Sequence, residues 1–216
     1  MHKKIALVTG ASRGLGYQVA KLLATSNVHV LGLARTIGGL ENLSDEINSL
    51  KGSSTMIPLD LTNDLDLESL AKNIFERWNK VDFLIHAASI ASPMAPVSSV
   101  SLKDFDHSLM VNTRATLKLI QVIDPLIRLS KNGMAIFVDD LIDGKFLSTY
   151  SSSKAASRSI IYSYQKESER IGVKVSIFNP SPMPTSLRAR FYPGETRTHL
   201  SSCESQAGKL IELFEL

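Results

Sequence analysis

Short apolar runs alternate with amphipathic stretches along most of this chain. The apolar runs predict strands at 5–8, 28–34, 54–58, 81–86, 134–139 and 173–178. The amphipathic stretches predict helices at 15–26, 40–50, 65–79, 101–130, 150–171 and about 202–214. Strands that alternate with helices are typical of a parallel sheet with crossover helices on both faces. The pattern therefore predicts an α/β protein, and its length favours a single domain over 1–216.

The segment 181–201 interrupts this alternation. It contains Pro182, Pro184, Pro193 and Gly194 among mixed charges. Long loops of a compact domain are often functional. We therefore expect this segment to be a loop that covers a substrate site.

Composition narrows the function classes. Hydrophobic residues make up 44% of the chain, and 24 basic and 21 acidic side chains give a net charge of +3. This small and evenly spread charge does not favour a nucleic-acid partner. One cysteine, Cys203, and five scattered histidines predict neither a disulfide nor a metal site. The absence of a long apolar run argues against a membrane span and favours a cytoplasmic location.

A glycine-rich turn follows the first predicted strand. The stretch Thr9–Gly16 has the spacing G-x-x-x-G-x-G and leads directly into a predicted helix. Backbone N–H groups and the positive end of the helix dipole make such a turn an anion site, and its glycines allow a pyrophosphate to approach closely. The turn predicts a bound nucleotide, and the alternative is an ordinary strand-to-helix turn.

The second predicted strand ends at Ala34, where dinucleotide-binding folds that prefer NAD carry an acidic residue. Arg35 follows it, and Arg13 lies within the glycine turn. Two guanidinium groups could bind a 2′-phosphate, which favours NADP(H) over NAD(H). In the alternative interpretation both arginines are solvated surface residues.

Three further positions each allow a structural and a functional interpretation. Asp60, after the third strand, could cap the next helix or accept a hydrogen bond from adenine. The small residues of 87–89 could allow a ligand to approach the backbone or could simply pack closely. Asn112 could be a satisfied core amide, or it could distort its helix and hold a water molecule.

Tyr150 and Lys154 carry the strongest chemical signal. At positions i and i+4 of a predicted helix they share one face. A free phenol titrates near pH 10, and a neighbouring ammonium lowers that pKa toward neutrality. Tyr150 could then act as a general acid toward a carbonyl or a base toward an alcohol.

Together these residues resemble the short-chain dehydrogenase/reductase family, from Ile5 to about Gly194. The resemblance implies a Rossmann-like, doubly wound sheet of strand order 3-2-1-4-5-6. It also implies hydride transfer between a nicotinamide cofactor and a carbonyl or alcohol carbon. Tyr150 would donate the proton, Lys154 would lower its pKa and bind the nicotinamide ribose, and Asn112 would position a water molecule.

The same resemblance assigns a set of residues to the cofactor. They are Gly10, Ser12, Arg13, Gly14, Leu15, Gly16, Arg35, Asp60, Leu61, Ala87, Ala88, Tyr150, Lys154, Pro180 and Thr185.

The chain departs from the family pattern at two places in the site. His86-Ala87-Ala88-Ser89 replaces the pattern N-N-A-G, which should remove one hydrogen bond on the cofactor side. The catalytic serine that ends strand five is replaced by Asp140, or by Asp139 in the neighbouring register. A carboxylate only accepts hydrogen bonds, so it would oppose the charge that develops on a substrate oxygen. A metal site of Asp139, Asp140 and Asp143 is a weaker alternative.

The chain also ends without the family's seventh strand, which predicts that strand six lies at a sheet edge. By resemblance, the helices 101–130 and 150–171 should pair between subunits of a homodimer or homotetramer. The preferred function is an NADP(H)-dependent oxidoreductase for a small carbonyl or alcohol substrate. The alternatives are a non-catalytic dinucleotide-binding protein and a structural subunit of a larger enzyme.

Overall fold

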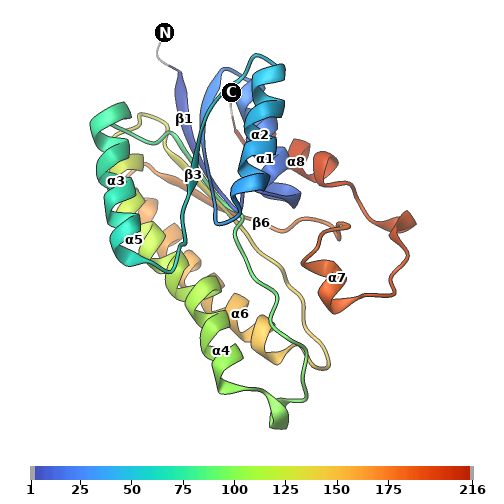
Figure 1. Ribbon diagram of the computed structural model, residues 1–216. Helices are drawn as coiled ribbons and strands as arrows, with labels where there is room; N and C mark the ends of the chain where they lie inside the picture. The colour runs from blue at the N-terminus through green and yellow to red at the C-terminus, as the bar shows by residue number, and fades with distance from the viewer. Residues whose placement is uncertain (1–2, 215–216) are drawn as a thin grey trace.

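The computed structural model describes residues 3–214 and has a central sheet between two layers of helices (Figure 1). The six strands of these residues are all parallel and follow the order β3-β2-β1-β4-β5-β6, which confirms the predicted fold. The strands are β1 (Lys4–Thr9), β2 (Val28–Ala34), β3 (Ser53–Pro58), β4 (Phe83–His86), β5 (Met134–Val138) and β6 (Lys174–Phe178).

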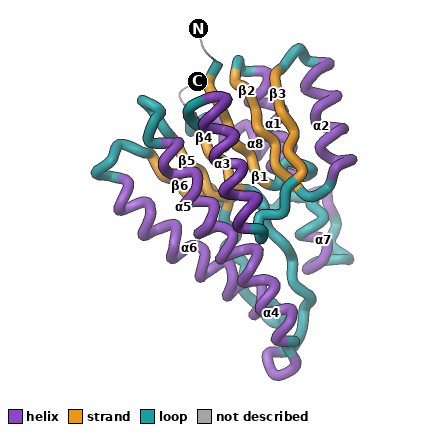
Figure 2. The backbone as a smooth tube through the Cα atoms, turned by 60° about the vertical axis from the view of Figure 1, so that its left-hand side comes forward, coloured by secondary structure: helices purple, strands orange, loops and turns teal. Residues whose placement is uncertain are grey.

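Both faces of the sheet are buried, because successive side chains of a strand point to opposite faces. Leu7 belongs to a core cluster with α3 (Asp64–Trp78), α5 (Ala115–Ile127) and α6 (Ser148–Ser168). Its neighbour Val8 belongs to a second cluster with α1 (Gly14–Thr25), α2 (Ile37–Ser49) and α8 (Cys203–Ile211). The two helical layers are seen on either side of the strands in Figure 2. Burial on both faces explains the continuous apolar runs of the sequence.

Helix α2 begins at Ile37, three residues before the predicted start, and includes Gly38 and Gly39. Glycine is a poor helix former, so a helix start beyond this pair was expected. A Cβ atom at Gly39 would lie 2.6 Å from the carbonyl oxygen of Ser12. The glycine therefore lets the first turn of α2 pack against the backbone of the glycine-rich turn.

The segment predicted as a helix over 101–130 is helical in the structure, with the helix distorted at Asn112. The segment consists of α4 (Leu102–Leu109), a π-helical turn at Met110–Arg114 and α5. A π turn inserts an extra residue into a helix and frequently marks a functional site. It brings Asn112 toward the loop that follows β4, where its side chain hydrogen-bonds the backbone of Ile90.

Strand β6 lies at one edge of the sheet within the part of the chain described. Its outward backbone is partly satisfied by α6, because Gln165 donates from Nε2 to the carbonyl oxygen of Val175 over 2.8 Å. A side chain that occupies an edge carbonyl limits the pairing of a further strand at that point.

The segment 181–201 is not structureless. It contains the short helix α7 (Arg188–Phe191) and a 3₁₀ turn at Arg197–His199. A further 3₁₀ turn, Val97–Ser99, lies in the loop after β4. Figure 1 shows α7 standing away from the sheet on the side of α8.

Candidate active site

The glycine-rich turn connects β1 to α1 in a conformation that requires glycine. Gly10 and Gly14 have φ angles of +71° and +62°, a region that other residues rarely adopt. A Cβ atom at Gly10 would lie 2.9 Å from the Cα of Ala88, and one at Gly16 would lie 2.5 Å from the carbonyl oxygen of Gly10. The turn therefore packs closely against the loop after β4, and Gly16 packs against the backbone of Gly10. Because these positions carry no side chain, the backbone N–H groups of the turn stay uncovered.

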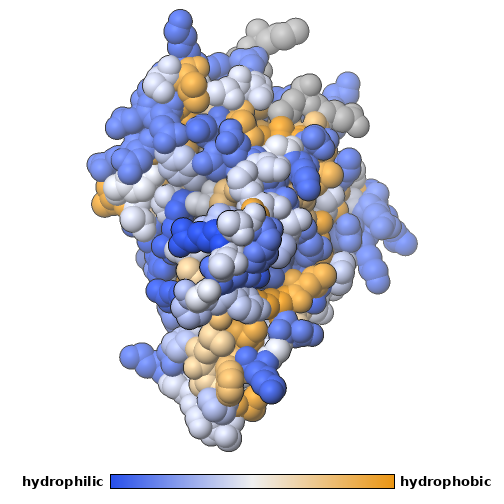
Figure 3. Space-filling view, turned by 90° about the vertical axis from the view of Figure 1, so that its right-hand side faces the viewer, coloured by the Kyte–Doolittle hydropathy of each residue, from blue (hydrophilic) through white to orange (hydrophobic). Residues whose placement is uncertain are grey.

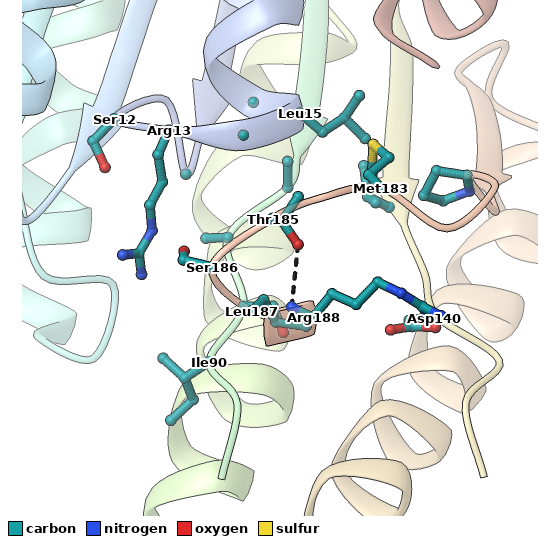
Figure 4. A pocket seen from close by; sticks show the side chains of 18 of the residues that line it. Ser12, Arg13, Leu15, Ile90, Asp140, Met183, Thr185, Ser186, Leu187 and Arg188 are labelled. Carbon is teal, nitrogen blue, oxygen red and sulfur yellow. Dashed lines mark hydrogen bonds between the residues drawn. The ribbon is translucent and has the colours of Figure 1, made fainter. Parts of the chain in front are cut away.

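The N-terminus of α1 opens into the cleft. Its N-cap residue Arg13 makes no side-chain capping bond. The first N–H groups of an α-helix have no partner within the helix. The positive end of the helix dipole therefore faces the cleft without an acidic residue in the first turn. Figure 4 shows the Arg13 side chain extended from this turn beside Ser12.

Arg35 and Asp60 lie at the far end of the cleft from Tyr150. An Arg35 Nη1 atom lies 3.7 Å from Asp60 Oδ2, and both side chains are about half exposed. Asp60 also accepts hydrogen bonds from the N–H and hydroxyl of Thr62, at 2.9 and 2.8 Å. Asp60 does not cap α3, because that role belongs to Asn63, which accepts from the N–H groups of Leu65 and Asp66.

His86 ends β4 and is buried behind the small residues Ala87 and Ala88. Its Nδ1 lies 2.8 Å from the hydroxyl of Thr9, and its Nε2 lies 2.9 Å from that of Thr116. Thr116 donates to the carbonyl oxygen of Asn112, so its oxygen is free to accept from Nε2–H. Thr9 then donates to Nδ1 while its oxygen accepts from the N–H of Ala88. The chain of bonds ties the glycine turn to the π turn through a neutral imidazole.

This burial gives His86 a predicted effect on stability. Desolvation and the charge of Lys154 lower its pKa to about 3, against an ordinary value near 6.5. The pKa of His86 is lower in the folded than in the unfolded protein. His86 therefore leaves the unfolding free energy unchanged above pH 6.5, and it lowers that free energy increasingly as the pH falls toward 3. We expect the wild type to lose about 2 kcal/mol of unfolding free energy from this residue by pH 5.

Urea unfolding at pH 7.5 and pH 5 measures that loss. His86→Asn should reduce the difference in unfolding free energy between pH 7.5 and pH 5 by about that amount. Replacement of the exposed His107 by asparagine should leave this difference unchanged. An unchanged pH dependence in His86→Asn would contradict the neutral assignment.

Tyr150 and Asp140 meet at the other end of the cleft. Tyr150 is 2% exposed, and its hydroxyl donates to Asp140 Oδ2 over 3.2 Å. Asp140, and not its neighbour Asp139, is therefore the residue that reaches the phenol. Burial, followed by the Asp140 charge, raises the pKa of Tyr150 above its ordinary value. The expected lowering of this pKa is wrong for the structure as it stands.

Lys154 explains the difference, because its ammonium is engaged elsewhere. Nζ donates to the carbonyl oxygen of Val138 at 3.1 Å and lies 3.6 Å from Asp139 Oδ1. Asp139 is buried and also pairs with Arg158, which lies one turn beyond Lys154 on α6. Burial lowers the pKa of Lys154, and the two carboxylates Asp139 and Asp140 partly oppose that effect.

Asn112 lies behind the cleft rather than in its wall. Its Oδ1 accepts from the N–H of Ile90 at 2.9 Å and from the hydroxyl of Ser89 at 3.1 Å. Its Nδ2 donates to the carbonyl oxygen of Ile90 and to the hydroxyl of Ser153, at 3.1 and 3.0 Å. The side-chain amide of Asn112 is thus hydrogen-bonded to protein groups, and it positions the loop that carries Ser89.

The segment around α7 covers the substrate end of the cleft, and we call residues 180–195 the lid. Thr185 accepts a hydrogen bond from the N–H of Arg188, drawn in Figure 4, and its methyl group faces Gly14. The Phe191 ring packs on Tyr150 with centroids 4.8 Å apart. Arg190 donates to the carbonyl oxygen of Ala91 at 3.3 Å, which joins the lid to the loop after β4.

One cleft gathers the residues that the sequence singled out, with the exception of Asn112. Its walls include Gly10, Ser12, Arg13, Gly14, Leu15, Gly16, Arg35, Asp60, Leu61, Ala87, Ala88, Asp140, Tyr150, Lys154, Pro180 and Thr185. Sequence reasoning missed Arg158 and Phe191, and it did not anticipate that Asp139 pairs with Lys154. A signal for Arg158 was present, because it continues the i, i+4 spacing of Tyr150 and Lys154.

The alternative metal site is not formed. No group of three or more His, Cys, Asp or Glu side chains that could hold a metal ion occurs in the described part of the chain. Asp139 faces Lys154 and Arg158, while the exposed Asp143 does not line the cleft. Within residues 3–214 no helix is both long and apolar enough to cross a membrane.

Comparison with known proteins places this fold and cleft in one family. Residues 4–196 match the family model of the short chain dehydrogenases, so the chain belongs to that family. A crystal structure of a short chain dehydrogenase from Shigella flexneri superimposes with a TM-score of 0.88 at 25% identity, covering 94% of this chain and 82% of that one.

The names of two similar proteins indicate the kind of activity. An uncharacterized oxidoreductase of Staphylococcus aureus (strain MW2) is 27% identical over 198 residues, which cover 90% of this chain and 84% of the relative. A fatty acyl-CoA reductase of Acinetobacter baylyi is 33% identical over 157 residues, or 71% of this chain. That match covers 53% of the reductase, so the chain corresponds to about half of its length. The chain is thus an oxidoreductase of the short-chain dehydrogenase type.

Proposed function

We propose that the protein transfers hydride between NADP(H) and a carbonyl or alcohol carbon of a small substrate. One observation carries the proposal: a single cleft joins the anion-binding glycine turn to Tyr150 and Lys154. Loss of NADPH-dependent carbonyl reduction on replacement of Tyr150 is the direct test.

The cleft fits a dinucleotide phosphate. The close approach at Gly10 and Gly16 leaves the backbone N–H groups at the start of α1 open to a diphosphate. Arg13 and Arg35 both line the cleft, and Ala34 offers no carboxylate against a 2′-phosphate. When bound, the nicotinamide supplies or accepts the hydride.

The acid–base role falls to Tyr150. Its raised pKa keeps the hydroxyl protonated at neutral pH, so it can donate to a carbonyl oxygen. Lys154 provides the buried positive charge at that end of the cleft, while Asn112 positions the loop of Ser89 through its backbone bonds. In the register favoured from the sequence, Asp140 stands where the family has its catalytic serine, and it accepts the hydrogen bond of the Tyr150 hydroxyl.

Cofactor preference gives a testable expectation. Calorimetry should show that NADPH binds more tightly than NADH, because a bidentate arginine contact to phosphate contributes about 1.5–3 kcal/mol. Arg35→Ala should weaken NADPH by about 10-fold or more and leave NADH nearly unchanged. Lys72→Ala, at an exposed position of α3, is the matched charge control. Equal affinities for both cofactors in the wild type would contradict the proposal.

A second candidate function is a binding protein that retains NADP(H) without turnover. It is favoured by the Tyr150–Asp140 hydrogen bond, which commits the phenol proton to a carboxylate and raises the pKa of the phenol. Tight NADPH binding with no reduction of any carbonyl compound, together with turnover gained in Asp140→Ser, would support this function over the first.

We also propose that the protein is a homodimer or homotetramer that pairs through α4–α5 and α6. Leu117 on α5 and Tyr162 on α6 are 40% and 50% exposed, which leaves apolar surface on these helices for a second copy. Light scattering at micromolar concentration should report a multiple of the 23.7 kDa chain. A monomeric mass would contradict the pairing.

A further inference from the structure

Asp140 is a carboxylate without a cation of its own. Its Oδ2 accepts from Tyr150, yet none of the ion pairs among the described residues includes it. The neighbouring cations are committed to other acids. Lys154 and Arg158 both pair with Asp139, and Arg158 reaches Asp140 only at its backbone oxygen.

Arg188 of the lid is the remaining cation near Asp140, and Figure 4 shows its side chain extended toward that residue. Its guanidinium binds Glu195 through two atoms, Nε at 2.6 Å and Nη2 at 2.7 Å. A bidentate pair of this kind is among the strongest hydrogen-bonded arrangements of arginine. Arg188 and Lys154 therefore act on Asp140 only at longer range, and among the described residues no cationic side chain donates a hydrogen bond to its carboxylate.

This arrangement fits a plain ketone poorly. Such a substrate offers its oxygen only as an acceptor, and the oxygen gains negative charge as it is reduced. Asp140 can only accept while ionised, so it would repel that oxygen. A substrate that brings a positively charged donor beside its carbonyl would bind Asp140 and remove the repulsion.

The spacing of the two protein groups defines where that donor lies. Tyr150 Oη and Asp140 Oδ2 are 3.2 Å apart. Oxygen and nitrogen atoms on adjacent carbons lie about 3 Å apart when the two bonds are gauche. Vicinal oxygen and ammonium groups can therefore meet Tyr150 and Asp140 together.

An apolar cluster lines part of the substrate end, beside the polar Ser89, Ser186 and Arg188. Tyr150 packs in one cluster with Phe191, Ala91 and Leu147, and Ile142 and Leu187 border it. Leu141, next to Asp140, is 64% exposed at the surface. Figure 3 shows the side of the molecule that carries the lid, with hydrophobic surface in its lower half. These surroundings suit an aryl or alkyl body rather than a sugar or a polyanion.

We propose that the substrate is an α-amino ketone with an apolar body, or the vicinal amino alcohol formed from it. Its oxygen lies at Tyr150 and its ammonium at Asp140. The inference rests on the proposed function, since it names the substrate class of the same site. It makes Asp140 the residue that determines specificity instead of a damaged catalytic position.

Three ketones of one carbon skeleton test the inference: propiophenone, 2-hydroxypropiophenone and 2-aminopropiophenone, each with saturating NADPH. We expect kcat/KM of the wild type to be about 10- to 100-fold higher for the amino ketone than for propiophenone, with the hydroxy ketone between them. Asp140→Ser should remove or reverse this order. Asp143→Asn removes a carboxylate from the same loop outside the cleft and should preserve it.

Binding supplies a readout that is independent of turnover. Calorimetry on the NADP⁺-saturated protein should show 2-amino-1-phenylpropan-1-ol binding about 10-fold or more tightly than 1-phenylpropan-1-ol. Asp140→Asn should abolish that difference, because a neutral amide makes no ion pair.

The outcomes separate this inference from the proposed function. Reduction of propiophenone at least as fast as the amino ketone overturns the inference and leaves the reductase standing. Asp140-dependent binding of the amino alcohol without turnover of any ketone supports the substrate class but overturns the reductase. Absence of both turnover and preferential binding overturns both.

Discussion

Replacement of Tyr150 by phenylalanine is expected to lower NADPH-dependent carbonyl reduction by about 10²–10⁴-fold, the usual contribution of a positioned general acid. The change deletes one oxygen atom from a side chain that is 2% exposed and packed on Phe191. The ring remains to fill its place, so the fold and the glycine turn should persist. The loss should therefore appear in kcat, with NADPH binding retained in calorimetry.

Tyr164→Phe is the matched control, since Tyr164 is a buried tyrosine of the same helix whose hydroxyl donates to Asp124 outside the cleft. It should leave both turnover and binding unchanged. If reduction in Tyr150→Phe equals that of the wild type, the proton comes from another group and the acid–base assignment is wrong.

Asp140→Ser is expected to raise turnover of a donor-free diketone or quinone by about 10²-fold, the typical effect of one oxyanion-hole donor. Two physical changes act in the same direction. Serine supplies a hydroxyl donor to the substrate oxygen. Removal of the carboxylate also frees the Tyr150 hydroxyl to donate to the substrate and lowers the pKa of the phenol.

Steady-state rates with NADPH, together with the pH dependence of kcat/KM, measure both effects. The alkaline limb of the profile should move to lower pH in Asp140→Ser. Asp143→Asn again serves as the control for net charge. An unchanged rate and profile, with NADPH still bound, would show that Asp140 does not act on the reacting oxygen.

The fold could be predicted because its determinants are local and repeated. The central strands β1 and β4 are apolar runs with buried side chains, and Gly10 and Gly16 pack closely against backbone in a tight turn. The positions of Tyr150 and Lys154 on one helix face also follow from spacing alone. These features depend on short stretches of sequence.

The charge state of the site could not be predicted in the same way. Lys154 and Tyr150 are four residues apart, but the partner that directs the ammonium is Asp139 on another element. The pKa of Tyr150 then depends on burial under Phe191, which comes from the lid 41 positions further along. Contacts between distant segments set these quantities, and a single sequence does not show their geometry.

Two positions for which the sequence left alternatives open depend on contacts of the same kind. The π turn at Met110–Arg114 depends on the bonds of Asn112 to Ile90 and Ser153, which the helical spacing of apolar residues does not encode. Asp60 and Asn63 are both good capping residues, and the choice between them depends on where α3 begins.

The internal bonds of the lid have a kinetic consequence. Thr185 with the N–H of Arg188, and Arg188 with Glu195, hold the segment in shape without help from the cleft. Its contacts with the opposite wall include the Phe191 ring on Tyr150 and one long hydrogen bond from Arg190 to Ala91. The lid can then open as a preformed unit, without breaking its internal hydrogen bonds. Its opening should therefore have a small enthalpy of activation. If lid opening limits turnover, the rate should fall in viscous solution and change little with temperature.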